Sequence, residues 1–263
     1  MRTQRGFTLI ESVMVITIAG IVMAMVALFI VPATTAYFDS ADRARLSDQA
    51  DTALRRMARD LTLALPNSTR VSASGMSVEL IPVSGAARYA VDSGDTLKFG
   101  VADSSFDIVG TPLTLSHGGQ QLAWYNLGAG IPDADAYNLS NVRTSTSGAG
   151  NQANVGFTGA ILPTSLLAPP YRVYAIEQPV SYRCDLSAKT LTRYSGYGFN
   201  AVQPDPPAGG TSAVLARDVS SCSFNFNAAA VAARYGLVTL QIALTRNSET
   251  VTLYHAVHVD NMP

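Results

Sequence analysis

The sequence predicts an α+β fold in which one long amino-terminal helix precedes a head of antiparallel strands. An unbroken apolar run extends from Phe7 to Val31, and residues 39–65 contain neither glycine nor proline. After Pro66 the pattern changes to short alternating runs separated by Gly, Ser, Asn and Pro, which is typical of strands and turns. A helix followed by a series of antiparallel strands belongs to the α+β class.

The first segment has the length and composition of a membrane span. The 25 residues from Phe7 to Val31 contain one charge, Glu11. As a helix they would be about 37 Å long, enough for a hydrocarbon core of about 30 Å. A removable signal has an apolar region of about 7–15 residues and a small-residue cleavage site, which does not follow here. Arg2 and Arg5 precede the span, so we expect a cytoplasmic amino end and an exported remainder.

Inserting a charge into a membrane span costs about 2.5–3.5 kcal/mol, so charges within spans are rare and usually functional. Glu11 is therefore a candidate functional residue. Pro32 is expected to kink or locally melt the helix near Val31. The helix should then resume and end at Leu65, before Pro66. Its apolar positions recur with helical period and should pack on the head: Leu46, Ala50, Leu54, Met57, Leu61 and Leu65. Charged residues occupy the other faces: Arg43, Arg45, Asp48, Asp51, Arg55, Arg56, Arg59 and Asp60.

The remainder predicts strands connected by turns and two long loops. Strands are expected at 77–83, 96–101, 113–115, 122–127, 171–176, 180–184 and 190–194, with turns at 84–85 and 93–94. Residues 128–170 and 203–212 are expected to be loops, and so long an irregular stretch is either functional or mobile. Strict alternation over 222–226, 238–244 and 251–259 predicts antiparallel strands, the last two joined by a turn at 246–249.

The composition excludes several classes of partner and site. The net charge is −1 and no basic stripe exists, so nucleic acid is not an expected partner. Cys184 and Cys222 are the two cysteines, and export to an oxidising compartment favours a disulfide over two buried free thiols. Closing a loop of about 38 residues would contribute roughly 4 kcal/mol.

No catalytic, cofactor or metal site is expected. His255 and His258 fall on opposite sides of a predicted strand, so they cannot chelate one ion. Asp133 and Asp135 lack the six to eight oxygen ligands and the loop pattern of a calcium site. The glycines near 148–156 lack the lysine of a phosphate-binding loop, and no Gly-x-Ser-x-Gly motif occurs. The sequence therefore does not predict an enzyme.

Residues 6–11, Gly6-Phe7-Thr8-Leu9-Ile10-Glu11, resemble the class III leader of type IV prepilins and type II secretion pseudopilins. The resemblance implies cleavage by a prepilin peptidase between Gly6 and Phe7 and N-methylation of Phe7. It also implies that Glu11 binds the amino terminus of a neighbouring subunit. The alternative is a plain signal anchor with an incidental glutamate. The implied fold is pilin-like, with a leader (1–6), a transmembrane and filament-core helix (7–31), an amphipathic continuation (32–66) and a β-rich head (67–263).

Shorter motifs resemble the minor pilins of mannose-sensitive haemagglutinin (MSHA) pili, of the MshO type: residues 63–68, 180–184, 191–194 and 255–259. They imply a low-copy subunit that helps to initiate or cap the filament. Its implied partners are other pilin subunits, the prepilin peptidase, the membrane and the inner-membrane assembly platform. Its head would be periplasmic before assembly and would lie in the pilus or at its tip afterwards. Two alternatives remain: a J-type minor pseudopilin of type II secretion, and an adhesin whose loops at 128–170 and 203–212 bind a surface ligand.

Overall fold

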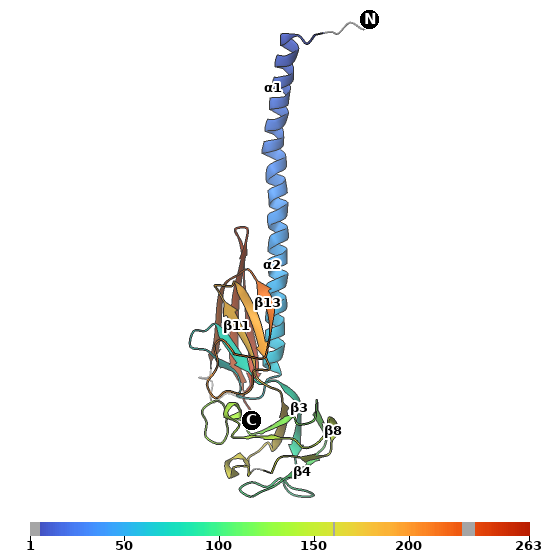
Figure 1. Cartoon of the computed structure of the whole chain (residues 1–263), viewed down its shortest axis with the longest axis vertical. Helices are drawn as coiled ribbons and strands as arrows, with labels where there is room; N and C mark the ends of the chain where they lie inside the picture. Colours follow the sequence, from blue (N-terminus) through green and yellow to red (C-terminus); the bar gives the residue numbers. More distant parts are fainter. Residues whose placement is uncertain (1–5, 160, 228–234) are drawn as a thin grey trace.

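The computed structural model describes residues 6–159, 161–227 and 235–263, and consists of one long helix that carries a two-lobed β head (Figure 1). The helix comprises α1 (Leu9–Met25), a π-helical segment η1 (Val26–Ile30) and α2 (Val31–Thr62). Its 54 residues are about 81 Å long at 1.5 Å per residue. The predicted α+β fold is confirmed, and the first half of the helix projects away from the head (Figure 1).

The helix passes Pro32 without melting. Proline has no N–H, and its ring would clash with the carbonyl group four residues earlier in a regular α-helix. The chain widens into η1 just before Pro32, and the Val31 N–H bonds to the Val26 oxygen, five residues back. The Thr34 hydroxyl donates to the Ile30 oxygen at 3.1 Å and to the Val31 oxygen at 2.8 Å. The local disruption predicted at this proline is therefore a π-helical turn.

The helix ends at Thr62, three residues before the predicted end. Leu63 is the C-cap, with φ −97° and ψ 11°, and Ala64 already pairs with Pro82 in a β-bridge. The Leu65 N–H donates to the Ile81 oxygen at 2.8 Å. These contacts pull residues 63–65 away from the helix axis, so the predicted helical position of Leu65 was wrong.

The first lobe, which we call the proximal lobe, is built on α2 and two antiparallel sheets. The first sheet has the order β1 (Arg70–Val71), β2 (Ser77–Leu80), β11 (Val180–Asp185), β12 (Thr190–Ser195) and β13 (Thr211–Arg217). The second has the order β14 (Val219–Asn227), β15 (Tyr235–Arg246) and β16 (Glu249–Asp260). The helix contacts β13, β15 and β16. Its apolar stripe forms one core with both sheets: Leu46, Ala50, Ala53, Leu54, Met57, Leu61, Val78, Tyr182, Leu191, Phe224, Leu240 and Ile242.

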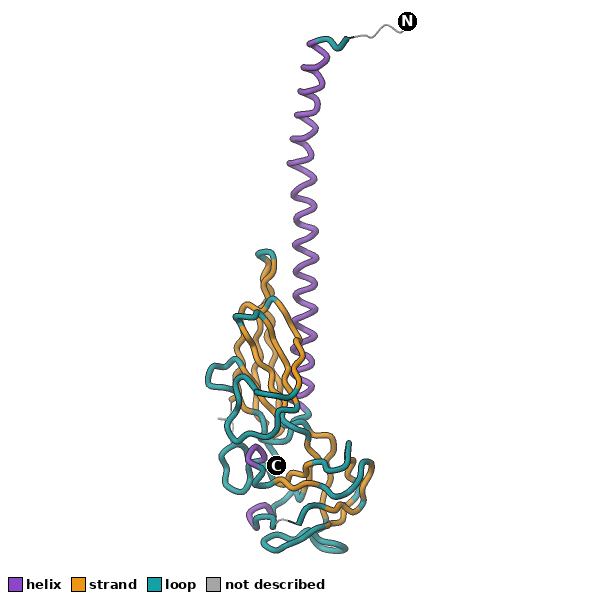
Figure 2. The backbone as a smooth tube through the Cα atoms, viewed as in Figure 1, coloured by secondary structure: helices purple, strands orange, loops and turns teal. Residues whose placement is uncertain are grey.

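The second lobe, the distal lobe, lies beyond the end of the helix (Figure 2). Its six-stranded sheet has the order β7 (Val142–Thr144), β6 (Gln121–Trp124), β10 (Arg172–Ile176), β3 (Val83–Tyr89), β4 (Ser105–Val109) and β9 (Asn154–Gly156). A bridge between Ser145 and Phe157 joins the two outer strands, so the sheet closes into a small barrel. A further pair, β5 (Leu113–Leu115) and β8 (Gly150–Gln152), and two 3-10 turns, η2 (Ala136–Asn138) and η3 (Thr164–Leu166), complete the lobe.

The distal lobe is an insertion into the proximal lobe. Val83 and Ile176, at its two ends, are register partners, and the Glu177 N–H donates to the Pro82 oxygen at 2.9 Å. It has a separate aromatic core: Tyr89, Phe106, Leu113, Leu115, Leu122, Trp124, Val155, Phe157 and Val173. The chain therefore leaves the pilin-like arrangement of helix and sheets once and returns to it at the same point.

Three predictions for this lobe were wrong. Residues 96–101 form no strand, because the Lys98 N–H bonds to the Asp103 carboxylate at 2.8 Å and the Gly100 N–H to the Leu162 oxygen at 2.8 Å. Residues 84–85 lie inside β3 instead of a turn, and a Cβ on Gly85 would collide with the Thr114 carbonyl of β5. The expected loop at 128–170 contains β7, β8, β9, η2 and η3.

A third cluster joins the lobes, and we call it the junction. Its apolar members are Leu65, Ile81, Ala123, Ala136, Tyr137, Val142, Tyr174 and Ile176. A buried ion pair lies beside it: Arg70 bonds to Glu79, and their side chains are 13% and 1% exposed. The Tyr197 hydroxyl donates to Glu79 at 2.7 Å. The Arg70 guanidinium lies over the Tyr137 ring, 3.5 Å from its centroid.

Candidate functional site

The predicted cleavage point lies outside the helix and is open to solvent. Gly6 and Phe7 have no regular secondary structure, and Phe7 is 77% exposed. Thr8 is the N-cap, with φ −87° and ψ 151°, and the helix begins at Leu9. The Gly6–Phe7 peptide bond is therefore accessible to a peptidase at the mouth of the helix.

Glu11 occupies the third helical position, three residues after the N-cap. The Glu11 N–H donates to the Thr8 carbonyl at 3.1 Å and approaches the Thr8 hydroxyl at 3.4 Å. Thr-x-x-Glu is the capping-box pattern, and a carboxylate in the first turn also favours the positive end of the helix dipole. The sequence carried this pattern, but its capping role was not predicted. Among the described residues the Glu11 carboxylate has no hydrogen-bond or ion-pair partner, so it is available to a second molecule.

The helix around Glu11 is uncovered by the rest of the chain. None of the residues of α1 is buried, and Leu9 is 85% exposed. This helix is long and apolar enough to cross a membrane. Water would be an unfavourable environment for so large an apolar surface, at about 25 cal/mol per Å². The shaft formed by α1 and η1 therefore requires a cover, which lipid or the apolar helices of other subunits can provide.

The head makes polar contacts with the helix at Asp42 and Arg43. The turn between β15 and β16 reaches along α2, and Glu249 bonds to Arg43 at 2.7 Å. The Asn247 side-chain amide donates to the Asp42 carboxylate at 2.7 Å. The residues before Asp42 extend beyond these contacts, while the helix from Asp42 onward is fixed to the proximal lobe.

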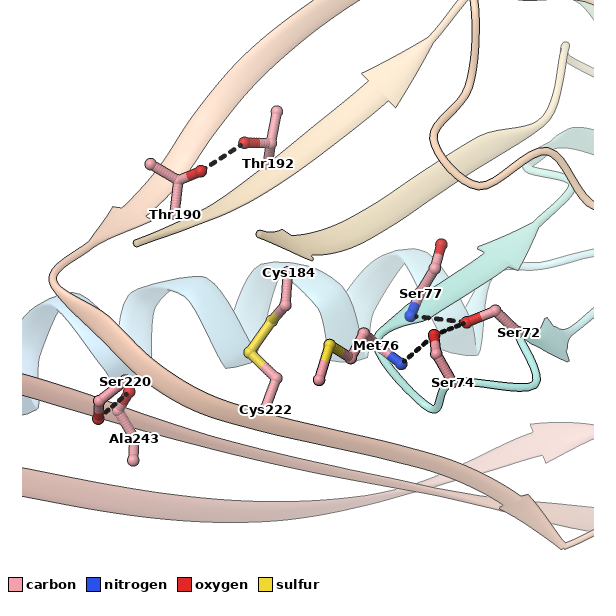
Figure 3. The surroundings of a disulfide bond; sticks show 10 residues. All are labelled: Ser72, Ser74, Met76, Ser77, Cys184, Thr190, Thr192, Ser220, Cys222 and Ala243. Atoms are coloured by element: carbon pink, nitrogen blue, oxygen red, sulfur yellow. Dashed lines mark hydrogen bonds between the residues drawn. A yellow bond between two sulfur atoms is a disulfide. The ribbon is translucent and has the colours of Figure 1, made fainter. Parts of the chain in front are cut away.

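The proximal lobe is held together by a disulfide between Cys184 of β11 and Cys222 of β14 (Figure 3). The two Cα atoms are 6.4 Å apart, and the bond links the two sheets on either side of the core. The Cys184 N–H also donates to the Met76 oxygen at 2.8 Å, and Met76 lies beside the sulfur atoms in Figure 3. The bridge fixes the sheets onto which α2 packs.

The candidate metal-binding residues do not form a site: the histidines lie apart, and Asp135 accepts hydrogen bonds from the backbone. His255 is half-buried and His258 exposed, on opposite faces of β16. Asp135 is buried and accepts bonds from the Gly130 N–H and the Tyr137 N–H, both at 2.8 Å. Within residues 6–159, 161–227 and 235–263, no group of three or more His, Cys, Asp and Glu side chains could hold a metal ion.

Comparison with known proteins adds one match, at the amino end. Residues 1–27 match the family model of the prokaryotic N-terminal methylation motif. This match includes the accessible Gly6–Phe7 bond and Glu11, and it supports the type IV pilin and pseudopilin superfamily. The chain matches no curated protein and no solved structure. The motif implies interaction with other pilin subunits and with a prepilin peptidase in general, and it covers 27 of the 263 residues.

Proposed function

We propose that this protein is a minor subunit of a type IV pilus that helps to initiate, prime or cap the filament. In this proposal a prepilin peptidase cleaves between Gly6 and Phe7, and Phe7 is then N-methylated. Glu11 binds the new amino terminus of a neighbouring subunit in the filament core. Before assembly the shaft spans the inner membrane and the head is periplasmic. The short motifs favour a subunit of the MshO type, and a J-type pseudopilin is the alternative.

One observation carries the proposal: the exposed apolar shaft continues without a break into α2, whose second half packs into the core of the proximal lobe. The only charge in the described part of the shaft, Glu11, has no partner there and lies five residues from the proposed cleavage point. A buried carboxylate repays its desolvation only when a cation pairs with it. Cleavage after Gly6 would create such a cation on every processed subunit, so shafts that pack side by side supply one another's partner.

The proposal can be tested on the amino terminus of the mature protein. We expect the full chain, isolated from sheared filaments of cells with a prepilin peptidase, to begin at N-methylated Phe7. Intact-mass spectrometry would detect the loss of residues 1–6 and the gain of one methyl group. The matched variant Gly6→Val should retain residues 1–6 and remain in the membrane fraction. A wild-type chain that keeps its first six residues, or never enters filaments, would overturn the proposal.

The distal lobe favours a second function, as an adhesive module. It is a separate barrel at the end of the head that is furthest from the shaft, and it carries most of the residues expected to form binding loops (Figure 1). The test is a variant in which a short Gly-Ser linker replaces residues 83–176. Leu65→Ser and Ile81→Ser are added because the deletion uncovers these two junction residues. We expect this variant to enter filaments. Cells with this chain should lose surface attachment. Attachment at the wild-type level would exclude the barrel as the adhesive surface.

A further inference from the structure

The helix α2 presents an arginine face on the side opposite to the core. Its buried residues all point toward the two sheets of the proximal lobe. Arg45, Arg56 and Arg59 are spaced by 11 and 3 residues, which places them above one another along the exposed side. Thr52 lies between them on the same side and is also exposed. We call these three arginines the arginine face.

The charges of this face are not neutralised within the described chain. Arg45, Arg56 and Arg59 form no salt bridge or side-chain hydrogen bond in the part that the structure describes. The aspartates Asp51 and Asp60 are used elsewhere: Asp51 bonds to Arg55 at 2.7 Å, and Asp60 accepts from the Tyr182 hydroxyl and from Arg193. Asp48 is the one carboxylate on this side of α2 that stays free among the described residues.

The surface beside the arginine face is hollowed. One hollow of about 470 Å³ is lined by Thr52, Arg55, Arg56, Arg59 and Asp60. A second, of about 400 Å³, lies between α2 and the corner that joins β13 to β14. It brings Arg217 toward Arg45, and it is also lined by Arg246, which pairs with Asp42 at 3.9 Å, and by the carboxylates Asp48 and Asp218. Thr52 lines both hollows, so the two lie next to each other along the helix.

We propose that the arginine face docks onto an acidic surface on the head of a neighbouring subunit. This inference rests on the proposed function, because it requires subunits that assemble through their shafts. Helices that pack together lie about 8–10 Å apart. A neighbour whose shaft packs beside α1 therefore places its head next to the exposed side of α2. Guanidinium groups pair bidentately with carboxylates, so an acidic partner would satisfy these unpaired cations.

The length of the face favours a protein partner over a lipid surface. Arg45 and Arg59 are 14 residues apart, or about 21 Å along the helix. A headgroup layer is only about 5–7 Å thick on each side of the hydrocarbon core. Arg59 lies 28 residues past Val31, about 42 Å beyond the end of the apolar run. Arg45, the end of the face nearest the membrane, already lies 14 residues past Val31, or about 21 Å, so the whole face lies beyond the headgroup layer, whereas a neighbouring head can cover all of it.

The test uses the full chain in cells that make the filament. A photo-crosslinking amino acid at Thr52 should form an adduct with an acidic segment of another subunit. The variant Arg45→Glu/Arg56→Glu/Arg59→Glu should enter sheared filaments at least tenfold less than wild type. The tenfold loss corresponds to about 1.4 kcal/mol, and it is expected because three attractions to the acidic partner are turned into repulsions. The matched control changes three exposed cations away from α2: Arg88→Glu, Lys98→Glu and Lys189→Glu.

Reversing the charge of the crosslinked acidic residues should restore the incorporation of the triple variant into filaments. If the triple glutamate variant is unstable, the same positions changed to glutamine should still reduce incorporation. An adduct with phospholipid alone would overturn the proposal. Normal incorporation of the triple variant would also overturn it. If Glu11→Ala blocks incorporation while the triple variant enters normally, this inference alone fails; if neither variant has an effect, the proposed function fails as well.

Discussion

Replacing Glu11 with alanine is expected to abolish incorporation of this protein into filaments while leaving it in the membrane. The apolar run from residue 7 to residue 31 keeps its length and loses its only charge, so insertion should be as good as in wild type or better. In the filament core, the amino terminus of the neighbour would lose its partner. Leaving one member of a buried ion pair unpaired costs about 3–5 kcal/mol, which corresponds to a hundredfold or larger loss of assembly.

The local role of Glu11 in the helix cap requires a control. Thr8→Ala removes the N-cap side chain, at a cost of about 0.5–2 kcal/mol, and keeps the carboxylate. Glu11→Gln keeps the length of the side chain and removes its charge. If the charge binds a neighbour, Glu11→Ala and Glu11→Gln should both be absent from sheared filaments, while Thr8→Ala should enter them. Equal loss in Thr8→Ala and Glu11→Ala would instead assign Glu11 to the cap alone. The amounts in filament and membrane fractions can be compared by immunoblotting.

The helix and the carboxy-terminal hairpin were predictable because their patterns are long. The apolar stripe from Leu46 to Leu61 and the alternation over 238–244 and 251–259 each repeat often enough to identify one period. The distal barrel was not predictable from the sequence. Two of its strands, β7 and β9, are only three residues long. Such short strands do not show a period, and their pairing comes from closure of the barrel, which is a non-local property.

The functional residues also fall into those that a local motif predicts and those that depend on non-local contacts. Glu11 and the Gly6–Phe7 bond stand out because a local motif specifies them. The capping geometry of Thr8 was visible as Thr-x-x-Glu and could have been predicted. The ion pair at the junction could not, because Arg70 and Glu79 acquire their burial from residues near 137 and 197. A charged residue is most often exposed, so the sequence gives no sign that these two are enclosed.

Replacing Arg70 with methionine is expected to destabilise the head by about 3–5 kcal/mol. The side chain of Glu79 is 1% exposed, so its carboxylate would remain buried without its cation. Arg70 also donates to the backbone oxygens of Ala201 at 2.7 Å and Asn200 at 2.8 Å, and both acceptors would lose that bond. The matched variant Arg88→Met, at an exposed arginine, should change the free energy of unfolding by less than about 0.5 kcal/mol.

The loss of unfolding free energy caused by Arg70→Met should become smaller as the pH falls. Burial raises the pKa of the Glu79 carboxyl above its unfolded value of 4.5, and Arg70 and Tyr197 oppose this rise. Without Arg70 the folded-state pKa is expected to rise further. A carboxyl with a raised pKa contributes stability that is fully present below its unfolded pKa and is lost as the pH rises through the folded-state pKa. The free energy of unfolding of the variant, relative to wild type, should therefore increase between pH 7 and about pH 5.

The double variant Arg70→Met/Glu79→Gln separates the charge from the other contacts of Arg70. It has no ionisable group at residue 79, so its stability relative to wild type should lack the gain toward low pH. Chemical unfolding of the full chain in detergent can follow Trp124, the single tryptophan, which is buried in the distal barrel. Far-UV circular dichroism reports mainly on the long helix. Because Arg70 lies where the lobes meet, its loss should lower the stability that both signals report. A deficit that is equal in the single and double variants at every pH would show that Glu79 is not held as a buried carboxylate, and that the lobes are joined by apolar packing alone.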